Sequence, residues 1–231
     1  MVSNDYIILD GVSSNTVGIY CDTPSVPPMA RQRYTTYQTG AEEDGTTADN
    51  TFEDISYTVT LYAFWEEDLL NSELYAYLFN KSRLSFSRHE GWYYKIRRLE
   101  VEEPELEADG NRIIYRVTFV LSPFRYSTEN SAISVSSGDI VENTGNYYSR
   151  PLITLTATGD VTISVNGREF KLSAVAGTVN IDSERHIVYS GNTVIYNKDS
   201  GSYPLLAVGN NVITYSGTVT SLTIQKNERC L

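Results

Sequence analysis

The chain has 231 residues, of which 41% are hydrophobic and 20% are charged, and its formal net charge is −11. This balance is that of a globular protein and excludes an intrinsically disordered chain, while the negative field excludes nucleic-acid binding through a basic surface. Tyrosine is enriched, with 18 copies against two Trp and seven Phe. Because tyrosine favours half-buried strands, the composition predicts a β-rich protein.

The sequence shows no signal for export or for a membrane partner. The first residues have neither the basic region nor the apolar core of a secretory signal, and no apolar run reaches the roughly 20 residues that a membrane span requires. Cys21 and Cys230 lie far apart and form no CxxC pair. We therefore expect synthesis and folding in a reducing cytoplasm.

The first half of the chain alternates apolar and polar residues with a period of two, which predicts strands. After two short strand patterns and a proline-rich connector, long patterns cover Arg31–Thr39 and Thr51–Phe64. They flank an acidic, glycine-containing segment at 40–45. This layout predicts a long hairpin arm over residues 31–64 with an acidic tip.

One helix is predicted, over residues 66–80. The acids at 66–68 lie in its first turn, where the helix dipole favours negative charge. Apolar residues then recur at helical spacing, namely Leu69, Leu70, Leu74, Tyr77 and Leu78. Strand patterns return at 84–86, 93–101 and 112–121, and Asp109-Gly110-Asn111 is a turn signal that joins the last two.

A segment rich in Ser, Asn and Thr at 127–138 marks the boundary between two predicted domains, 1–129 and 130–231. Beyond it, strand patterns recur roughly every 8 to 12 residues, which is typical of a β-sandwich. The expected strands are 140–143, 152–157, 161–165, 169–172, 177–181, 186–189, 211–215 and 219–225. Asn166-Gly167 between two of them is a strong hairpin signal. The predicted fold class is all-β, mainly β with one helix.

The sequence contains no convincing catalytic constellation. His89 and His186 are the only histidines. The run Asp182–His186 holds the residue types of a serine triad, but triad members act from separate elements, and a polar turn is the simpler interpretation. Acids at 100, 102, 103, 105 and 107 could supply a carboxylate pair for glycoside hydrolysis, although acids around Pro104 more often protect a strand edge from pairing. No Cys/His cluster has metal-ligand spacing. We predict no enzyme, no cofactor and no catalytic or metal-binding residue.

Four aromatic residues leave a second functional class open. Trp65, Trp92, Tyr147 and Tyr148 could stack on a sugar ring in a carbohydrate-binding module or lectin-like adhesin. Packing in a core or an interface is the commoner use of such side chains. Glycan binding therefore stays the alternative hypothesis.

An ordered series of motifs in the second half resembles the C-terminal domain of siphophage distal tail proteins. The series contains Asn143-Thr144-Gly145, Pro151-Leu152-Ile153, Asn166-Gly167, Ile181-Asp182-Ser183-Glu184, Val188-Tyr189, Tyr203–Asn211 and Leu222–Arg229. The first half, with its strands, long hairpin and single helix, is similar to the ring-forming domain of that family. The Cys230-Leu231 ending and the strongly acidic hairpin tip depart from the family pattern.

The resemblance implies a structural hub at the tip of a long bacteriophage tail. Such proteins form a hexameric ring through which DNA passes, and their C-terminal domains are galectin-like or carbohydrate-module-like sandwiches. The implied partners are other copies of the chain, the tail tube protein, a tail-associated tip protein and receptor-binding or baseplate proteins. The implied location is the tail tip of the virion, with neither sequence-specific nucleic acid nor a membrane as a partner.

The two long strand patterns of the arm offer edges that neighbouring subunits could pair. We therefore expect the subunit interface to include residues from both patterns, namely Arg31, Tyr34, Tyr37, Phe52, Ile55 and Tyr57. The charge is also uneven, since residues 1–127 carry −9 of the net −11. We expect these acids to be biased toward the channel of the ring, where they would repel phosphate. The acids at 40–55 could equally well solvate an outward loop.

Overall fold

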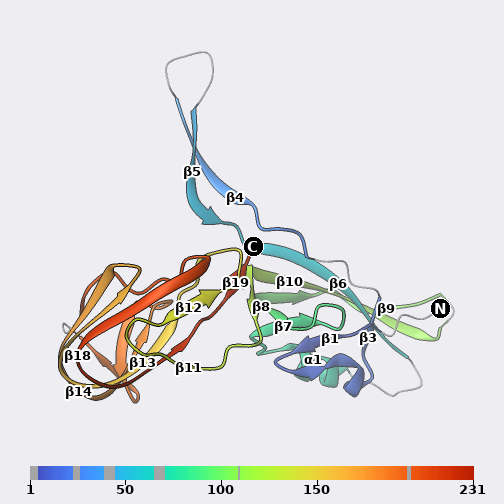
Figure 1. The fold of residues 1–231 in the computed structure, drawn as a ribbon. Coiled ribbons are helices and arrows are strands. Elements are labelled where there is room, and N and C mark those ends of the chain that lie inside the picture. The colour runs from blue at the N-terminus through green and yellow to red at the C-terminus, as the bar shows by residue number, and fades with distance from the viewer. Residues whose placement is uncertain (1–4, 23–26, 39–44, 65–70, 109, 197–198) are drawn as a thin grey trace. The chain divides into compact units, whose positions relative to one another are not determined.

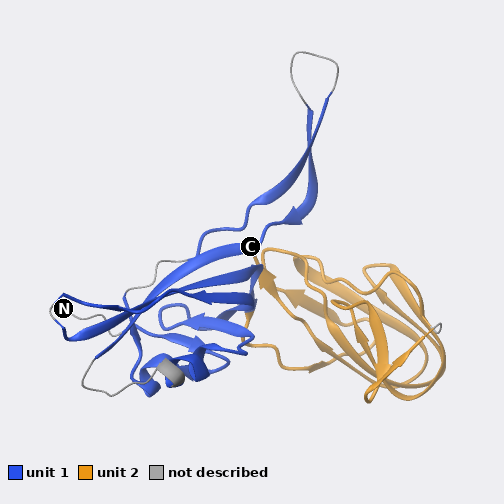
Figure 2. Cartoon of the chain, turned by 180° about the vertical axis from the view of Figure 1, so that it is seen from behind, with its two compact units in different colours: residues 1–126, 231 blue, residues 127–230 orange. Residues whose placement is uncertain are grey.

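The computed structural model describes residues 5–22, 27–38, 45–64, 71–108, 110–196 and 199–231. The chain divides into two compact units, residues 1–126 with 231 and residues 127–230, which Figure 2 distinguishes by colour. Antiparallel strands dominate both units. The prediction of an all-β fold with one α-helix is confirmed for the described residues.

Unit 1 is an antiparallel sheet with a short helix packed on one face (Figure 1). Its elements are β1 (Ile7–Leu9), β2 (Val12–Ser13), the 3-10 helix η1 (Ser14–Val17), β3 (Tyr20–Cys21), β4 (Gln32–Tyr37), β5 (Gly45–Phe52), β6 (Ile55–Phe64), α1 (Asn71–Leu78), β7 (Arg83–Phe86), β8 (Trp92–Val101), β9 (Glu105–Leu106) and β10 (Arg112–Ser127). The strand order is β2-β1-β7-β8-β10-β6-β3, with β9 paired to β10.

The core of unit 1 follows from strict alternation on β6 and β10, which pair from Ile55↔Leu121 to Phe64↔Arg112. The side chains on one face of both strands are buried, whereas the other face carries polar pairs such as the hydroxyls of Thr58 and Thr118, 2.8 Å apart. Side chains of this kind stabilise a sheet through cross-strand contacts. One face is therefore a core, while the other is polar around Thr58 and Thr118 and carries the contacting rings of Tyr62 and Phe64 at the end of β6.

The helix packs on the buried face through Leu74, Tyr77 and Leu78. The Tyr77 hydroxyl donates to the backbone carbonyls of Ile7 and Val12, at 3.1 and 3.0 Å, and so ties the helix to β1 and β2. The structure describes the helix from residue 71 to residue 78. The predicted first turn at 66–68 lies outside the described residues.

Unit 2 is a sandwich of long, bent strands. Its elements are β11 (Ile133–Ser134), β12 (Ile140–Asn143), β13 (Leu152–Val165), β14 (Arg168–Asp182), β15 (Ile187–Ser190), β16 (Thr193–Ile195), β17 (Asp199–Gly201), β18 (Gly209–Gln225) and β19 (Arg229–Cys230). The order is β11-β18-β13-β14-β15-β16, with β12 paired to β18 and β17 to β14. Alternate residues of β13, β14 and β18 fill one hydrophobic core.

Three pairs of predicted strands are each one continuous strand in the structure. Patterns 152–157 and 161–165 form β13, 169–172 and 177–181 lie within β14, and 211–215 and 219–225 lie within β18. The polar interruptions are β-bulges, with a register shift between Gly159 and Val161, rather than turns. A bulge bends a strand without ending it.

The Asn166-Gly167 hairpin is confirmed, because Val165 pairs directly with Arg168. Both loop residues have positive φ, 51° and 82°, and a two-residue type I′ turn requires this at both positions. Asn tolerates the left-handed region better than most side chains, and Gly adopts it without strain.

Unit 2 is expected to fold on its own when expressed as residues 127–230. Its core is separate from that of unit 1, and its first residues are held by the last ones, since Asn130 exchanges hydrogen bonds with Asn227 at 2.6 and 2.9 Å. Near-UV circular dichroism and cooperative thermal unfolding would check this. A shorter version, 138–230, lacks the buried Val135 and the Asn130 contacts and should melt at a lower temperature. A disordered 127–230 fragment would contradict the prediction.

Candidate assembly interface

The arm is a two-stranded ribbon made by β4 and β5, which pair with each other and with no other described strand (Figure 1). This confirms a hairpin arm but corrects its extent. Residues 55–64, predicted to be its second strand, form β6 in the sheet of unit 1. The arm therefore covers residues 31–53, and its predicted acidic tip at 40–45 lies outside the described residues except for Gly45.

The root of the arm is fixed by one backbone hydrogen bond and one ring contact. The Glu53 N–H donates to the Arg31 carbonyl at 2.9 Å, and the Phe52 ring packs edge-on against Phe124 of β10, with centroids 5.6 Å apart. Two polar residues, Glu53 and Asp54, then separate β5 from β6. A ribbon of two strands is marginal when it stands alone, so the arm requires a further surface to pack on.

The two faces of the arm carry different side chains. Alternation along β4 places Arg33 and Tyr37 on one face and Tyr34 on the other. Tyr37 is 51% exposed and Tyr34 is 61% exposed. The Tyr37 ring lies across Gly45, where a Cβ atom would come within 2.5 Å of it, so the glycine makes room for the ring. Exposed tyrosines are characteristic interface anchors.

The structure separates the six predicted interface residues. Arg31, Tyr34 and Tyr37 are exposed on the arm, and Phe52 is half-buried at its root. Ile55 and Tyr57 are each only 5% exposed and belong to the core of unit 1. These two residues therefore pack within unit 1 rather than on the arm, and an interface role for the exposed residues of the set stays a prediction.

A surface hollow of about 260 Å³ lies at the root of the arm. It is lined by Pro28, Met29, Ala30, Arg31, Glu53, Asp54, Ile55 and Ser56. Met29 is 76% exposed. Of the residues that line the hollow, the sequence analysis named only Arg31 and Ile55 as interface candidates. It did not name Arg33 on the arm either. The alternation along 31–37 was the signal that could have identified Arg33.

Sequence and structure comparisons give different results for this chain. No family model and no curated protein matches the sequence. Among solved structures, the chain is similar to the crystal structure of the SPP1 Dit (gp 19.1) protein, described as a paradigm of the hub adsorption apparatus in phages that infect Gram-positive bacteria. The TM-score is 0.70 over 99% of this chain and 100% of that chain, at 13% identity. The chain has the Dit fold. The resemblance to siphophage distal tail proteins is thereby confirmed at the level of the fold.

Within this Dit fold, the asparagine motifs of unit 2 have a structural role. The Asn143 amide donates to the carbonyls of Tyr147 and Leu206, and its oxygen accepts the Gly145 N–H. A Cβ atom on Gly145 would come within 2.4 Å of the Arg229 carbonyl oxygen. The Asn-x-Gly pattern is therefore required by close backbone packing and by buried hydrogen bonds.

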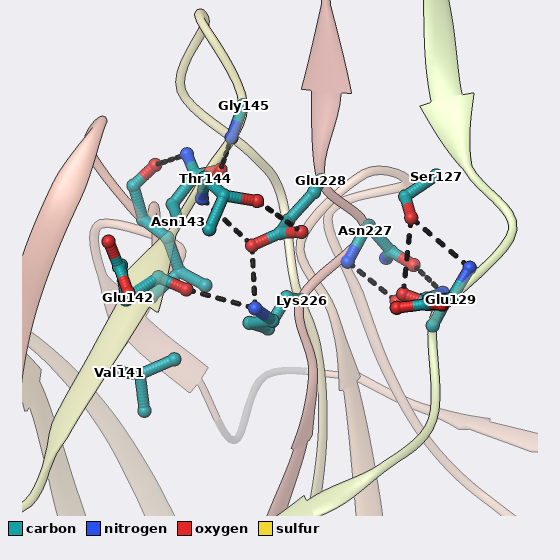
Figure 3. A network of polar contacts seen from close by, with 12 residues as sticks. Ser127, Glu129, Val141, Glu142, Asn143, Thr144, Gly145, Lys226, Asn227 and Glu228 are labelled. Atoms are coloured by element: carbon teal, nitrogen blue, oxygen red, sulfur yellow. Dashed lines mark hydrogen bonds and ion pairs between the residues drawn. The ribbon is translucent and has the colours of Figure 1, made fainter. Parts of the chain in front are cut away.

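A buried carboxylate joins the same loop to the last strand of the Dit fold (Figure 3). Glu228, 7% exposed, accepts hydrogen bonds from the Thr144 N–H and hydroxyl at 2.9 and 3.0 Å and from the Lys226 ammonium at 2.6 Å. Burial opposes ionisation of Glu228, but the bonds from Lys226 and Thr144 and the Lys226 charge outweigh it and lower the pKa of this carboxyl. The ionised form thus stabilises the folded state.

The stability of unit 2 should therefore fall in acid in a way that depends on Glu228. Because folding lowers the pKa of Glu228, its ionised form adds to the free energy of unfolding. This contribution is complete above the pKa of the unfolded state, near 4.5, and is lost as the pH falls through the pKa of the folded state. Glu228→Gln should cost about 1.5–3 kcal/mol at pH 7, and its difference from wild type should shrink between pH 5 and pH 2. Urea unfolding across this range measures the effect, with the exposed Glu142→Gln as control. A constant difference would contradict the assignment.

The tyrosines considered for sugar stacking are already packed on other side chains. The rings of Tyr147 and Tyr148 contact each other at a tilt of 33°, with centroids 4.5 Å apart, and the Arg229 guanidinium lies over both rings, at 5.3 and 4.7 Å. In unit 1, the Arg125 guanidinium lies over Trp92 at 5.1 Å, and Trp65 lies outside the described residues. These contacts make the packing interpretation the better supported one.

The residues considered for catalysis have structural roles in the Dit fold. Asp182 accepts the N–H groups of Glu184 and Arg185, both at 3.0 Å, as a polar turn requires. His186 stacks on Tyr203 at 4.9 Å.

Two of the candidate acids pair with arginines of β10. Glu105 lies 2.8 Å from Arg116, and Glu107 accepts a hydrogen bond from Arg112 at 2.6 Å. Glu105 and Glu107 therefore form ion pairs with β10, in addition to any role in protecting a strand edge from pairing. In the part of the chain that the structure describes, no group of acidic, His and Cys side chains could hold a metal ion, and neither described helix is long and apolar enough to cross a membrane.

Proposed function

We propose that the chain is a structural hub at the tip of a bacteriophage long tail, where it forms a hexameric ring that joins the tail tube to the host-adsorption apparatus. The observation that carries this proposal is the similarity to the Dit hub protein over 99% of the chain. The arm supports it independently, because a two-stranded ribbon with exposed tyrosines requires a partner surface.

The arm is compatible with a closed ring. The surface it offers differs from the sheet surface it would pack on, so each copy can bind the next one head to tail, and such contacts close into a ring when the rotation permits. In this role unit 1 forms the ring and unit 2 faces the adsorption proteins. The partners are further copies of the chain, the tail tube protein, a tail-associated tip protein and receptor-binding or baseplate proteins.

In this hub the chain has a scaffolding role and no catalytic one. DNA passes through the ring during infection, and the surplus acids of residues 1–127 line the channel. Carboxylates there repel phosphate at short range, within about 8–10 Å at physiological salt, whereas lysines and arginines would hold the duplex by releasing its counterions.

Immunogold labelling of intact virions tests the proposed location. Antibodies raised against the purified chain should label the end of the tail that is distal to the capsid. Antibodies preabsorbed with the purified chain serve as the control. Label on the capsid or along the whole tube would overturn the proposal.

A further inference from the structure

We infer that the hollow at the root of the arm is the acceptor surface for the arm of the next subunit, with the face of β4 that carries Arg33 and Tyr37 seated on it. This inference rests on the proposed ring and names the two surfaces that would make its contact. The occupant of the hollow is a second copy of this chain.

The charges of the two surfaces are complementary. The hollow contains the carboxylates of Glu53 and Asp54 and one guanidinium, that of Arg31. Asp54 has only a distant partner, Arg97 at 3.9 Å, and both side chains are largely exposed. No ion pair involving Glu53 or Arg33 occurs among the described residues, and both side chains are exposed. The hollow therefore carries net negative charge, and the arm face brings an available cation.

The shapes and apolar groups also correspond. The hollow is about 260 Å³ and is bordered by the exposed Met29, a flexible side chain that adapts to aromatic partners. Tyr37 presents its ring on the same face of β4 as Arg33, four residues further on. At about 3.3 Å per residue, the two side chains lie roughly 13 Å apart. The arm face thus offers one aromatic ring and one guanidinium. The hollow offers Met29 to the ring and two carboxylates to the guanidinium.

The arm face and the hollow are different surfaces of the same unit. Each subunit has one donor surface and one acceptor surface, so the six copies of the proposed ring can satisfy every arm when each binds the next. A free arm would leave both Tyr37 and the hollow exposed to water. The charge pair mainly sets the specificity and register of the contact.

Charge reversal with compensation tests the inference. Arg33→Glu alone, or Glu53→Arg with Asp54→Arg, should weaken ring assembly at least about tenfold, since like charges then face each other. Combining the three substitutions should restore assembly to within about threefold of wild type. Matched controls in unit 2, Arg168→Glu and Glu142→Arg, should leave assembly unchanged. Mass photometry over a dilution series gives the association constants.

Disulfide trapping provides a second measurement that does not depend on charge. Met29→Cys together with Tyr37→Cys should give covalently linked multimers under mild oxidation. Met29→Cys with Tyr34→Cys, which lies on the opposite face of β4, should give far fewer. The native cysteines Cys21 and Cys230 are buried, so the background should be low.

The outcomes separate the inference from the proposed function. If the wild-type protein forms rings but neither charge reversal nor trapping has an effect, the inference fails and the hub function stands. If the wild-type protein never assembles, alone or with neighbouring tail proteins, both fail. Restoration by the triple variant, together with face-specific trapping, would support the inference.

Discussion

Replacing residues 32–52 with an Asp-Gly turn is expected to leave a folded subunit that no longer assembles. The two ends to be joined are already adjacent, since the Glu53 N–H donates to the Arg31 carbonyl. The replacement also removes the packing of the Phe52 ring on Phe124 of the unit 1 sheet. The melting temperature should change by only a few degrees, roughly the effect of 1 kcal/mol or less in a domain of this size.

Assembly should weaken more than about a hundredfold, because the replacement removes the exposed Tyr37 together with Arg33 on the same face of β4, and a truncated interface hot spot typically costs 2 kcal/mol or more. Mass photometry measures the loss, and near-UV circular dichroism verifies the fold. The control shortens only the tip, residues 40–44, and should keep assembly. Normal rings from the armless protein would refute the role given to the arm.

Asn211→Ala is expected to destabilise unit 2 strongly. The Asn211 side chain is fully buried, its amide donates to the carbonyls of Val141, Ala207 and Gly209, and its oxygen accepts from the Ala207 N–H and the Asn166 amide. Alanine leaves several of these groups buried without partners, and each such group costs about 1–3 kcal/mol. We expect a loss of about 3 kcal/mol and a fall in Tm of roughly 10–20 °C.

The neighbouring residue gives a matched control for this substitution. Asn210 is exposed on the opposite face of the same strand, so Asn210→Ala should change stability by less than about 0.5 kcal/mol. Both variants can be compared by urea unfolding of the full chain, with near-UV circular dichroism as the probe. Equal stability of the two variants would show that the buried Asn211 amide does not stabilise unit 2.

Alternation along the strands predicted the β fold, and the Asn166-Gly167 turn was predicted correctly because a two-residue type I′ loop has a specific residue requirement. The extent of the arm was predicted wrongly for a physical reason. Each half of the pattern 51–64 alternates, but the apolar positions shift phase at Glu53 and Asp54, from Phe52 to Ile55. The chain leaves the ribbon and enters the sheet at this shift. Tertiary packing decides this, because Ile55 and Tyr57 are drawn into the core of unit 1.

The surface proposed as an interface was only partly predictable, because it too depends on tertiary packing. Exposed tyrosines on the arm could be anticipated from strand periodicity, but the hollow at its root combines residues 28–31 and 53–56, which only the fold brings together. Likewise, the asparagines of unit 2 were visible as a motif, whereas their buried hydrogen bonds depend on partners up to 70 residues away.

The central claim, that the chain is a ring-forming hub, is tested most directly by mass photometry of the purified full-length protein, alone and mixed with its neighbouring tail proteins. The account predicts a discrete species with the mass of six copies of the 25.9 kDa chain, either alone or with a tail partner. A protein that stays strictly monomeric in every mixture would contradict it.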